Sequence, residues 1–170
     1  SFKRRHRLQH RRGGDRGESV RQRDLLFAER LGVRLEVPDE QRVISIEDTR
    51  ELRANHRNWV PMVCGRGTSA LPSARDCLVN SLRMRPDRLI IGECRGAEAY
   101  DFLSAINTGH EGSMTTIHAN SASDSLSRLE NLITLGHSEI PIKYLRKQMA
   151  TGIQLVVQLQ RTSDGQRKVE

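Results

Sequence analysis

The chain has 170 residues, enough for one domain with a hydrophobic core, although only 36% of the residues are hydrophobic. Its formal net charge of +7 comes almost entirely from residues 1–30, which hold ten Lys or Arg against four Asp or Glu, a net +6. The rest of the chain is nearly neutral. The basic character therefore belongs to an N-terminal arm and not to a basic domain.

Cysteine usage and apolar content exclude further classes of protein. The three cysteines, Cys64, Cys77 and Cys94, include no C-x-x-C pair, so neither a disulfide framework nor a zinc site is indicated. No apolar run reaches the length of a signal peptide or of a membrane span. These features favour a reduced, cytoplasmic setting without direct membrane insertion.

Residues 1–36 form an Arg-rich arm with almost no apolar periodicity, for which disorder is predicted. Clustered arginines attract phosphate, so a nucleic-acid-binding arm is one interpretation, but aromatic stacking partners are nearly absent. A solvated tail is preferred, and no specific nucleic-acid partner is expected. The domain itself is predicted to span residues 37–170.

Apolar runs and amphipathic segments alternate after residue 37, a pattern typical of an α/β domain. The expected elements are a strand at 41–48, a loop with a short extra strand at 49–71, a helix at 73–85, a strand at 89–91, a helix at 98–107, a strand at 112–119, a helix at 121–135, a helix at 140–149 extending to about 152, a strand at 153–160, a turn at 163–165 and a return strand at 166–170. Strands joined by a crossover helix predict a right-handed connection and a parallel sheet. The pattern breaks off within the last strand, which suggests a truncated sequence.

Acidic residues stand at the ends of two of these strands. Glu93 follows the apolar run at 89–91, and the strand at 41–48 ends in Glu47 and Asp48. The carboxyl ends of parallel strands meet at the sheet edge where ligands of open α/β sheets bind. Either acid alone would more often be an ordinary solvent-facing carboxylate. Their matching positions favour a shared site, which can hold Mg²⁺ through water and orient an attacking water.

A second block, NTGHEGSMTTIHAN, combines two histidines with several hydroxyls. Taken alone, His118 would be interpreted as a satisfied core histidine. With His110, Thr115 and Thr116 close in the sequence, a phosphate-sensing role gains weight. An imidazole donor there can report whether a γ-phosphate is present.

In order along the chain, these stretches resemble the secretion ATPase superfamily of type II and type IV secretion, conjugation and pilus assembly. The nearest likeness is to its CpaF-like branch, which drives Flp-type pili. That family's acidic box resembles VISIEDTREL, its Walker B strand resembles SLRMRPDRLIIGECRG, and its His box with the following helix resembles NTGHEGSMTTIHANSASDSLSRLENL. The resemblance runs from about Arg42 to the C-terminus.

The resemblance implies a RecA-like P-loop NTPase core, which is an αβα sandwich with a mostly parallel sheet. It further implies an ATP-hydrolysing motor component of a secretion or Flp-type pilus assembly system, a homo-hexamer that binds ATP and Mg²⁺ between subunits. Such a protein would be cytoplasmic and peripheral at the inner membrane, through secretion or pilus platform proteins.

Site residues also follow from the resemblance. Glu93, Glu47 and His118 would be catalytic, with Glu93 holding Mg²⁺ through water. The other implied nucleotide contacts are Asp48, Gly92, Arg95, His110, Thr115 and Thr116. Candidates for interface or phosphate contacts are Arg50, Arg53 and Arg95.

One family motif is absent from the sequence. A P-loop, G-x-x-x-x-G-K-[ST], should precede the acidic box, but the nearest text runs from Gly13 to Ser19, is one residue short and has Glu18 in place of the phosphate-binding Lys. The fold is therefore expected to be N-terminally incomplete. A one-nucleotide shift of codons for residues 5–24 permits Gly-Gly-Gly-Thr-Gly-Gly-Lys, so residues 1–36 are alternatively an out-of-frame remnant of the P-loop region.

Two consequences follow from the missing motif. A nucleotide-incompetent remnant or structural subunit of the family is the alternative to a working motor. The neighbours of an absent strand would expose ladder groups and apolar faces, so the isolated chain is predicted to be marginally stable or prone to aggregation.

Overall fold

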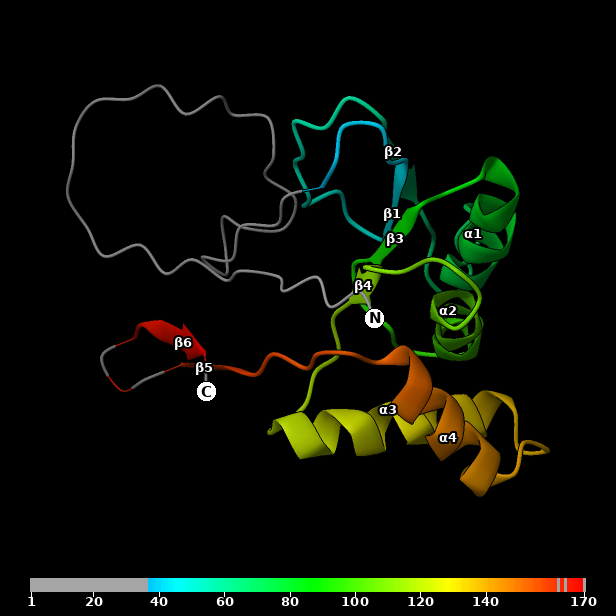
Figure 1. Ribbon diagram of the computed structural model, residues 1–170, viewed down its shortest axis with the longest axis vertical. Helices are drawn as coiled ribbons and strands as arrows, with labels where there is room; N and C mark the ends of the chain where they lie inside the picture. The colour runs from blue at the N-terminus through cyan, green and yellow to red at the C-terminus, as the bar shows by residue number, and fades with distance from the viewer. Residues whose placement is uncertain (1–36, 162, 164, 170) are drawn as a thin grey trace, which may run out of the picture.

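A four-stranded parallel sheet lies at the centre of this computed structural model, which describes residues 37–161, 163 and 165–169 (Figure 1). The sheet has the order β2-β1-β3-β4 and consists of β1 (Val43–Glu47), β2 (Trp59–Val63), β3 (Arg88–Ile91) and β4 (Met114–Thr115). Each of its three pairings is parallel. The predicted α/β class with a mostly parallel sheet is confirmed, and the extra strand expected within 49–71 is β2. The predicted arm at 1–36 lies outside the described residues.

Helices follow the strands at the places that the amphipathic pattern predicts. They are α1 (Ala74–Ser81), its 3₁₀ continuation η1 (Leu82–Met84), α2 (Glu98–Ile106), α3 (Ala122–Gly136) and α4 (Ile142–Gly152). The start of α1 is fixed by a capping box, because Ser73 Oγ accepts the Asp76 N–H at 3.1 Å and the Asp76 carboxylate accepts the Ser73 N–H at 3.1 Å. Ser121 caps α3 through the N–H of Asp124.

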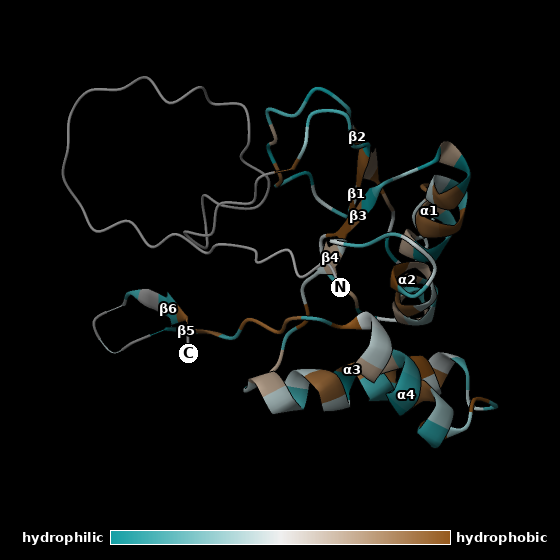
Figure 2. Ribbon diagram, in the orientation of Figure 1, coloured by the Kyte–Doolittle hydropathy of each residue, from teal (hydrophilic) through white to brown (hydrophobic). Residues whose placement is uncertain are grey.

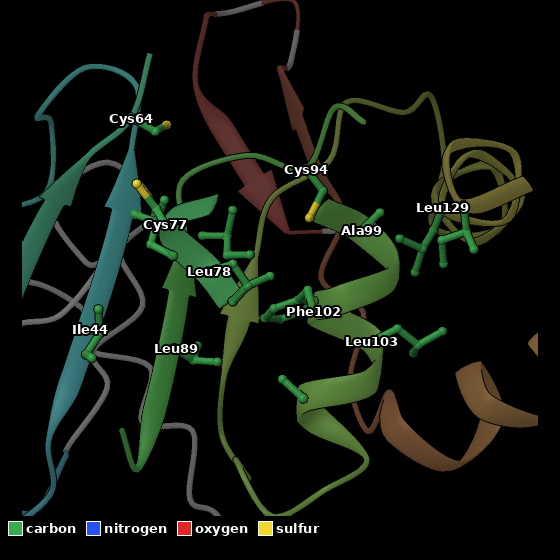
Figure 3. Packing of buried hydrophobic residues seen from close by; sticks show 14 of the residues in the cluster. Ile44, Cys64, Cys77, Leu78, Leu89, Cys94, Ala99, Phe102, Leu103 and Leu129 are labelled. Carbon is green, nitrogen blue, oxygen red and sulfur yellow. The ribbon is translucent and has the colours of Figure 1, made fainter. Parts of the chain in front are cut away.

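The two faces of the sheet are buried in different ways. Ile44, Ile46, Leu89 and Ile91 point towards α1 and α2, where they join one large core (Figure 3). The helix residues of that core include Cys77, Leu78, Ala99, Phe102, Leu103, Leu129, Ile133, Leu145 and Met149. Because α3 and α4 contribute to the same core, all four α-helices belong to one packed unit (Figure 1).

On the opposite face, Val43 and Ile90 pack with Val37 and Trp59 and with residues of the loop at 49–58. Burial on both faces explains why the strands read as nearly continuous apolar runs. No helix residue belongs to this second cluster in the described part of the chain. The second helical layer of an αβα sandwich is therefore not seen among those residues.

Two predicted strands are shorter in the structure. The strand expected at 112–119 is paired only over β4. Beyond it, the Thr116 hydroxyl donates to the Gly92 carbonyl at 2.6 Å, and the chain then leads to the cap of α3. The prediction of a strand at 153–160 is wrong over most of that range. Only β5 (Leu159–Arg161) is paired, antiparallel to β6 (Arg167–Val169), which confirms the return strand.

The segment 153–158 keeps the alternating apolar pattern of a strand but has no strand neighbour in the described part of the chain. Leu155, Val156 and Val157 are exposed as a result. Figure 2 shows hydrophobic colouring along this segment as well as on the central strands. An apolar period alone does not make a strand, because a strand needs a partner for its backbone groups.

Cys64, Cys77 and Cys94 are all buried and free, and their side chains belong to the large core (Figure 3). Burial raises the pKa of the Cys94 thiol to about 12, so it is a neutral packing group near pH 7. Among the described helices, none is both long and apolar enough to cross a membrane.

Candidate active site at the carboxyl edge of the sheet

The acid-bearing ends of β1 and β3 lie side by side. Ile46 is paired with Ile91 in the parallel register, and the Gly92 N–H extends the ladder by donating to the Ile46 carbonyl at 2.8 Å. The residues that follow, Glu47 with Asp48 and Gly92 with Glu93, therefore leave the sheet at one edge. The structure thus brings together the two acidic strand ends on which the sequence argument rests.

Glu47 is buried and holds the loop that follows β1. Its Oε1 atom accepts the backbone N–H of Glu51 at 3.1 Å and that of Leu52 at 2.9 Å. Gly92 makes room for this side chain, because a Cβ atom on Gly92 would lie 3.2 Å from Cγ of Glu47. The contacts described for Glu47 are those of a carboxylate that holds the loop after β1 in place.

Four side chains at this edge form a linear charge network, named here the carboxylate–arginine cluster: Arg66, Asp48, Arg95 and Glu93. The Oδ2 atom of Asp48 is paired with Arg66 and also accepts from Arg95 Nη1 at 3.0 Å. The guanidinium of Arg95 also pairs with the Glu93 carboxylate. His118 borders the cluster, with Nε2 3.5 Å from Glu93 Oε1.

The cluster keeps Glu93 ionised. The hydrogen bond from Arg95 is the main reason that the pKa of Glu93 is lowered, and the nearby charges of His118, Arg95 and Arg66 act in the same direction against partial burial. The same bond raises the pKa of Arg95. The ionised carboxylate can bind a cation, and the charged guanidinium can bind an anion. A phosphate ester with its metal ion presents both charges together.

Two residues that the sequence argument missed complete the edge. Arg66 comes from the loop after β2, and no sequence signal links it to Asp48. Glu98, at the first position of α2, accepts the N–H groups of Arg95 at 2.6 Å and Gly96 at 2.9 Å. Its position at a helix N-terminus after Gly96 is a signal that could have identified it, since acids there bind free backbone N–H groups.

The two threonines of the histidine block hold backbone and sulfur atoms at the same edge. The Thr116 hydroxyl donates to the Gly92 carbonyl at 2.6 Å, and the Thr115 hydroxyl donates to Cys94 Sγ at 3.3 Å. The Cys94 N–H adds a bond to the Thr116 carbonyl at 3.0 Å. In the structure these residues fix the exit of the chain from β3 next to β4.

His110, close to His118 in the sequence, lies away from it in the structure. It precedes β4, with Nδ1 3.1 Å from the Ala105 carbonyl at the end of α2. Ser113, between His110 and β4, accepts the N–H of Leu89 at the start of β3. His110 is therefore at the amino edge of the sheet. The two histidines flank a short strand, and a strand carries its two ends to opposite edges.

Neither Arg50 nor Arg53 is part of the described carboxylate–arginine cluster. The Arg50 guanidinium lies 5.7 Å from the centroid of the Trp59 ring, on the loop that covers the second face of the sheet. Arg53 is exposed on the same loop. Of the three arginines that the sequence singled out, the structure brings Arg95 alone to the acids.

Comparison with known proteins identifies relatives of this arrangement. Residues 32–169 match the family model described as Type II/IV secretion system protein. The type IV secretion system protein PtlH of Bordetella pertussis is 38% identical over 133 residues, which are 74% of this chain and 39% of that protein. The conjugal transfer protein TrbB of Rhizobium radiobacter is 36% identical over 130 residues, 76% of this chain and 38% of that protein.

The fold comparison agrees. The crystal structure of the VirB11 ATPase from the Brucella suis type IV secretion system, in complex with sulphate, superposes with a TM-score of 0.69 and 32% identity, covering 79% of this chain and 40% of that one. The chain thus spans about 40% of the length of the relatives it matches.

Proposed function

The chain belongs to the Type II/IV secretion system protein family, and on that premise we propose that it is part of an ATP-hydrolysing motor of a secretion system. The observation that carries the proposal is the carboxylate–arginine cluster at the carboxyl edge of the parallel sheet, bordered by His118. Open α/β sheets bind ligands at this edge. ATP is the substrate, consistent with the ATPases named among the relatives.

Each residue has a role that its surroundings support. Glu93, ionised and partly buried, would orient the attacking water and would hold Mg²⁺. His118 faces the γ-phosphate side of the site from its place beside Glu93. Glu47 fixes the loop that bears Asp48, and Gly92, Thr115 and Thr116 fix the exit of β3.

The donor set fits Mg²⁺ and a polyphosphate. Asp48 and Glu93 provide oxygen ligands of the type that Mg²⁺ prefers, and Arg66 and Arg95 provide guanidinium groups for phosphate oxygens. Bound Mg²⁺ would supply neutralisation of the charge that develops on the transferring phosphoryl group.

The wider assembly is proposed from the family. The working form is a homo-hexamer with ATP between subunits, cytoplasmic and held at the inner membrane by secretion platform proteins. Relatives named for type IV secretion and conjugal transfer support a role in one of those systems. A role in CpaF-like, Flp-type pilus assembly is a finer proposal on the sequence resemblance alone.

A nucleotide-incompetent structural subunit is the second candidate function. It is favoured by the absence of G-x-x-x-x-G-K-[ST] from the sequence, since the Lys of that motif contacts the β- and γ-phosphates. In that case the fold and the subunit interface would serve the ring without turnover.

Binding and hydrolysis of ATP separate the two candidates. The purified chain is titrated with a fluorescent ATP analogue and Mg²⁺, and phosphate release is followed in the wild type and in Glu93→Gln. Micromolar binding, with turnover abolished in Glu93→Gln and retained in the matched surface variant Glu130→Gln, supports the motor. Absence of binding up to millimolar analogue supports the structural subunit.

A further inference from the structure

The turn between β3 and α2, residues 92–97, carries Glu93 and Arg95 of the carboxylate–arginine cluster. One side chain holds the backbone of its second half. Oε1 of Glu98, the first residue of α2, accepts the N–H groups of Arg95 at 2.6 Å and of Gly96 at 2.9 Å. Gly96 leaves room for this carboxylate, because a Cβ atom there would lie 3.3 Å from Glu98 Oε2. With only 8% of its surface exposed, Glu98 is a buried side chain that ties the turn to the helix after it.

The first half of the turn is held by backbone atoms of the sheet. The Gly92 N–H donates to the Ile46 carbonyl at 2.8 Å, and the Cys94 N–H donates to the Thr116 carbonyl at 3.0 Å. Substitution of a side chain does not remove a backbone acceptor. The two bonds to Glu98, in contrast, depend on one side chain, so a substitution at position 98 can alter the second half of the turn by itself.

Arg95 reaches the acids from an exposed position. Its side chain is 46% exposed, and its guanidinium pairs with Glu93 in the same turn and, at 3.0 Å from Nη1, with Asp48 after β1. A long exposed side chain has many rotamers, so the position of its backbone determines what its guanidinium can reach. Because the Arg95 N–H is bound to Glu98, loss of that bond would allow the starting point of the side chain to move.

We propose that Glu98 is a positioning residue of the ATP site, which holds the turn at 92–97 so that the guanidinium of Arg95 faces the edge where phosphate binds. The inference rests on the proposed function, in which Arg95 donates to phosphate oxygens. Glu98 has no contact with the substrate and acts through Arg95. A guanidinium that is already in place loses less conformational freedom when a phosphate binds, so the bound state is favoured.

A purely structural role for Glu98 is the alternative. An acid in the first turn of a helix stabilises that helix through its free N–H groups and its dipole, whatever the neighbouring turn carries. Such a role would lower the stability of the fold without a particular effect on Arg95. The two roles therefore differ in what a substitution at Glu98 does once Arg95 has been removed.

The first experiment is a double-mutant cycle on the full chain, with inorganic pyrophosphate and Mg²⁺ as the probe and calorimetry as the measurement. Glu98→Ala and Arg95→Gln are each expected to weaken binding about tenfold. The double variant should also bind about tenfold more weakly than the wild type, and not a hundredfold, because Glu98 acts through Arg95.

Two conservative variants separate the hydrogen bonds from the charge. Glu98→Gln keeps an oxygen that can accept both N–H groups and should bind pyrophosphate within about twofold of the wild type. Glu98→Asp keeps an acid in the first turn of α2 but is one methylene shorter, so it should preserve the helix and still lose affinity. Glu98→Asp thereby keeps the test decisive if Glu98→Ala does not fold.

The second experiment needs no ligand. ¹⁵N relaxation measures the order parameter of the Arg95 Nε–H group, whose signal is assigned by its absence from Arg95→Gln. The order parameter should fall in Glu98→Ala and in Glu98→Asp and keep its wild-type value in Glu98→Gln. The matched control is Ser73→Ala, which removes the cap of α1 and should destabilise the fold while leaving the order parameter and the pyrophosphate affinity unchanged.

Three results would overturn the role of Glu98 and leave the proposed function standing. Losses of affinity that multiply to about a hundredfold in the double variant would show that Glu98 acts independently of Arg95. Equal affinities, or equal order parameters, in the wild type and the Ala and Asp variants at 98 would show that Glu98 does not position Arg95. An equal fall in the order parameter in Ser73→Ala would assign that fall to a general loss of stability. If the wild type binds neither pyrophosphate nor Mg-ATP, the proposed function fails and the role of Glu98 in it fails as well.

Discussion

The central sheet and the segment after α4 carry similar sequence patterns and reach opposite outcomes. VISI of β1 and LII of β3 are almost completely buried, with Ile44 at 0% and Ile46 at 1% exposure. IQLVVQ at 153–158 is also mostly apolar, yet Leu155 is 68% and Val157 is 47% exposed. The difference lies in their neighbours, because β1 has a strand on each side and residues 153–158 have none in the described part of the chain.

The comparison shows that pairing, and not hydrophobicity, decides which apolar run becomes a strand. Exposed valine and leucine side chains, on a segment with no strand neighbour among the described residues, form a template for association with other chains. This supports the prediction of a marginally stable or aggregation-prone isolated chain, which stays a prediction.

The largest expected contrast is between buried and exposed leucines. Leu89→Ala should lower the free energy of unfolding by about 2–5 kcal/mol, because it opens a cavity in the core between the sheet and the helices. Leu155→Ala should change it by less than about 0.5 kcal/mol. Urea denaturation followed by circular dichroism measures both. Equal losses would break the distinction between the two regions.

A second contrast is expected in alkaline solution. The unfolded Cys94 thiol has an ordinary pKa near 9.0, whereas burial raises the pKa of the folded thiol to about 12. A raised pKa in the folded state stabilises the protein below pH 9 and loses that contribution as the pH rises towards 12. At pH 10 the loss should be about 1.4 kcal/mol.

The measurement compares the pH dependence of unfolding in the wild type and in Cys94→Ala. Cys64 and Cys77 also have a raised pKa through burial, so only the difference between the two proteins isolates Cys94. Parallel curves from pH 8 to pH 11 would show that the thiol is not shielded by the core.

A loss of about 1 kcal/mol is expected when the cap of α1 is removed. Ser73→Ala deletes the hydroxyl that accepts the Asp76 N–H, in a helix that packs directly on β1. Ser73→Thr keeps an acceptor and should retain most of the stability. The readout is the midpoint of urea unfolding, and an unchanged midpoint in Ser73→Ala would show that tertiary packing alone holds this helix.

The smallest effect on stability, with a clear effect on association, is expected for polar changes in the exposed segment. Leu155→Thr and Val157→Thr together should alter the unfolding free energy by less than about 0.5 kcal/mol. They should reduce concentration-dependent self-association, because they remove exposed apolar area. Sedimentation velocity at several concentrations tests this, and unchanged association would place the responsible surface elsewhere.

The sequence was sufficient to predict the position of a residue when that position follows from its place at the end of a strand. Glu93 and Asp48 directly follow buried runs, so parallel pairing brings them to one edge. The sequence was insufficient to predict contacts between distant loops, such as that of Arg66 with Asp48. It was also insufficient to predict at which edge of the sheet His110 lies. A histidine pair around a short strand looks compact in the sequence, but the strand separates its members in space.

For a related reason, the sequence could not predict that residues 153–158 are not paired as a strand in the described part of the chain. Its alternation specifies which side chains share a face but not whether a partner strand is present. The small size of β4 was also not predicted: the described ladder pairs Met114 and Thr115, and Thr116 then contacts the exit of β3 through its hydroxyl and its carbonyl. Both errors concern the strand that a segment pairs with, which a single sequence does not show.

The close approach of Gly92 and Glu47 also determines how this protein can change over generations. A methyl group at position 92 would lie 3.2 Å from Cγ of Glu47, so one of the two has to give way. A shift of Glu47 would strain the hydrogen bonds that its carboxylate accepts from the amides of Glu51 and Leu52. We therefore expect the two positions to vary together: among related sequences, a larger residue at 92 should occur with a shorter one at 47.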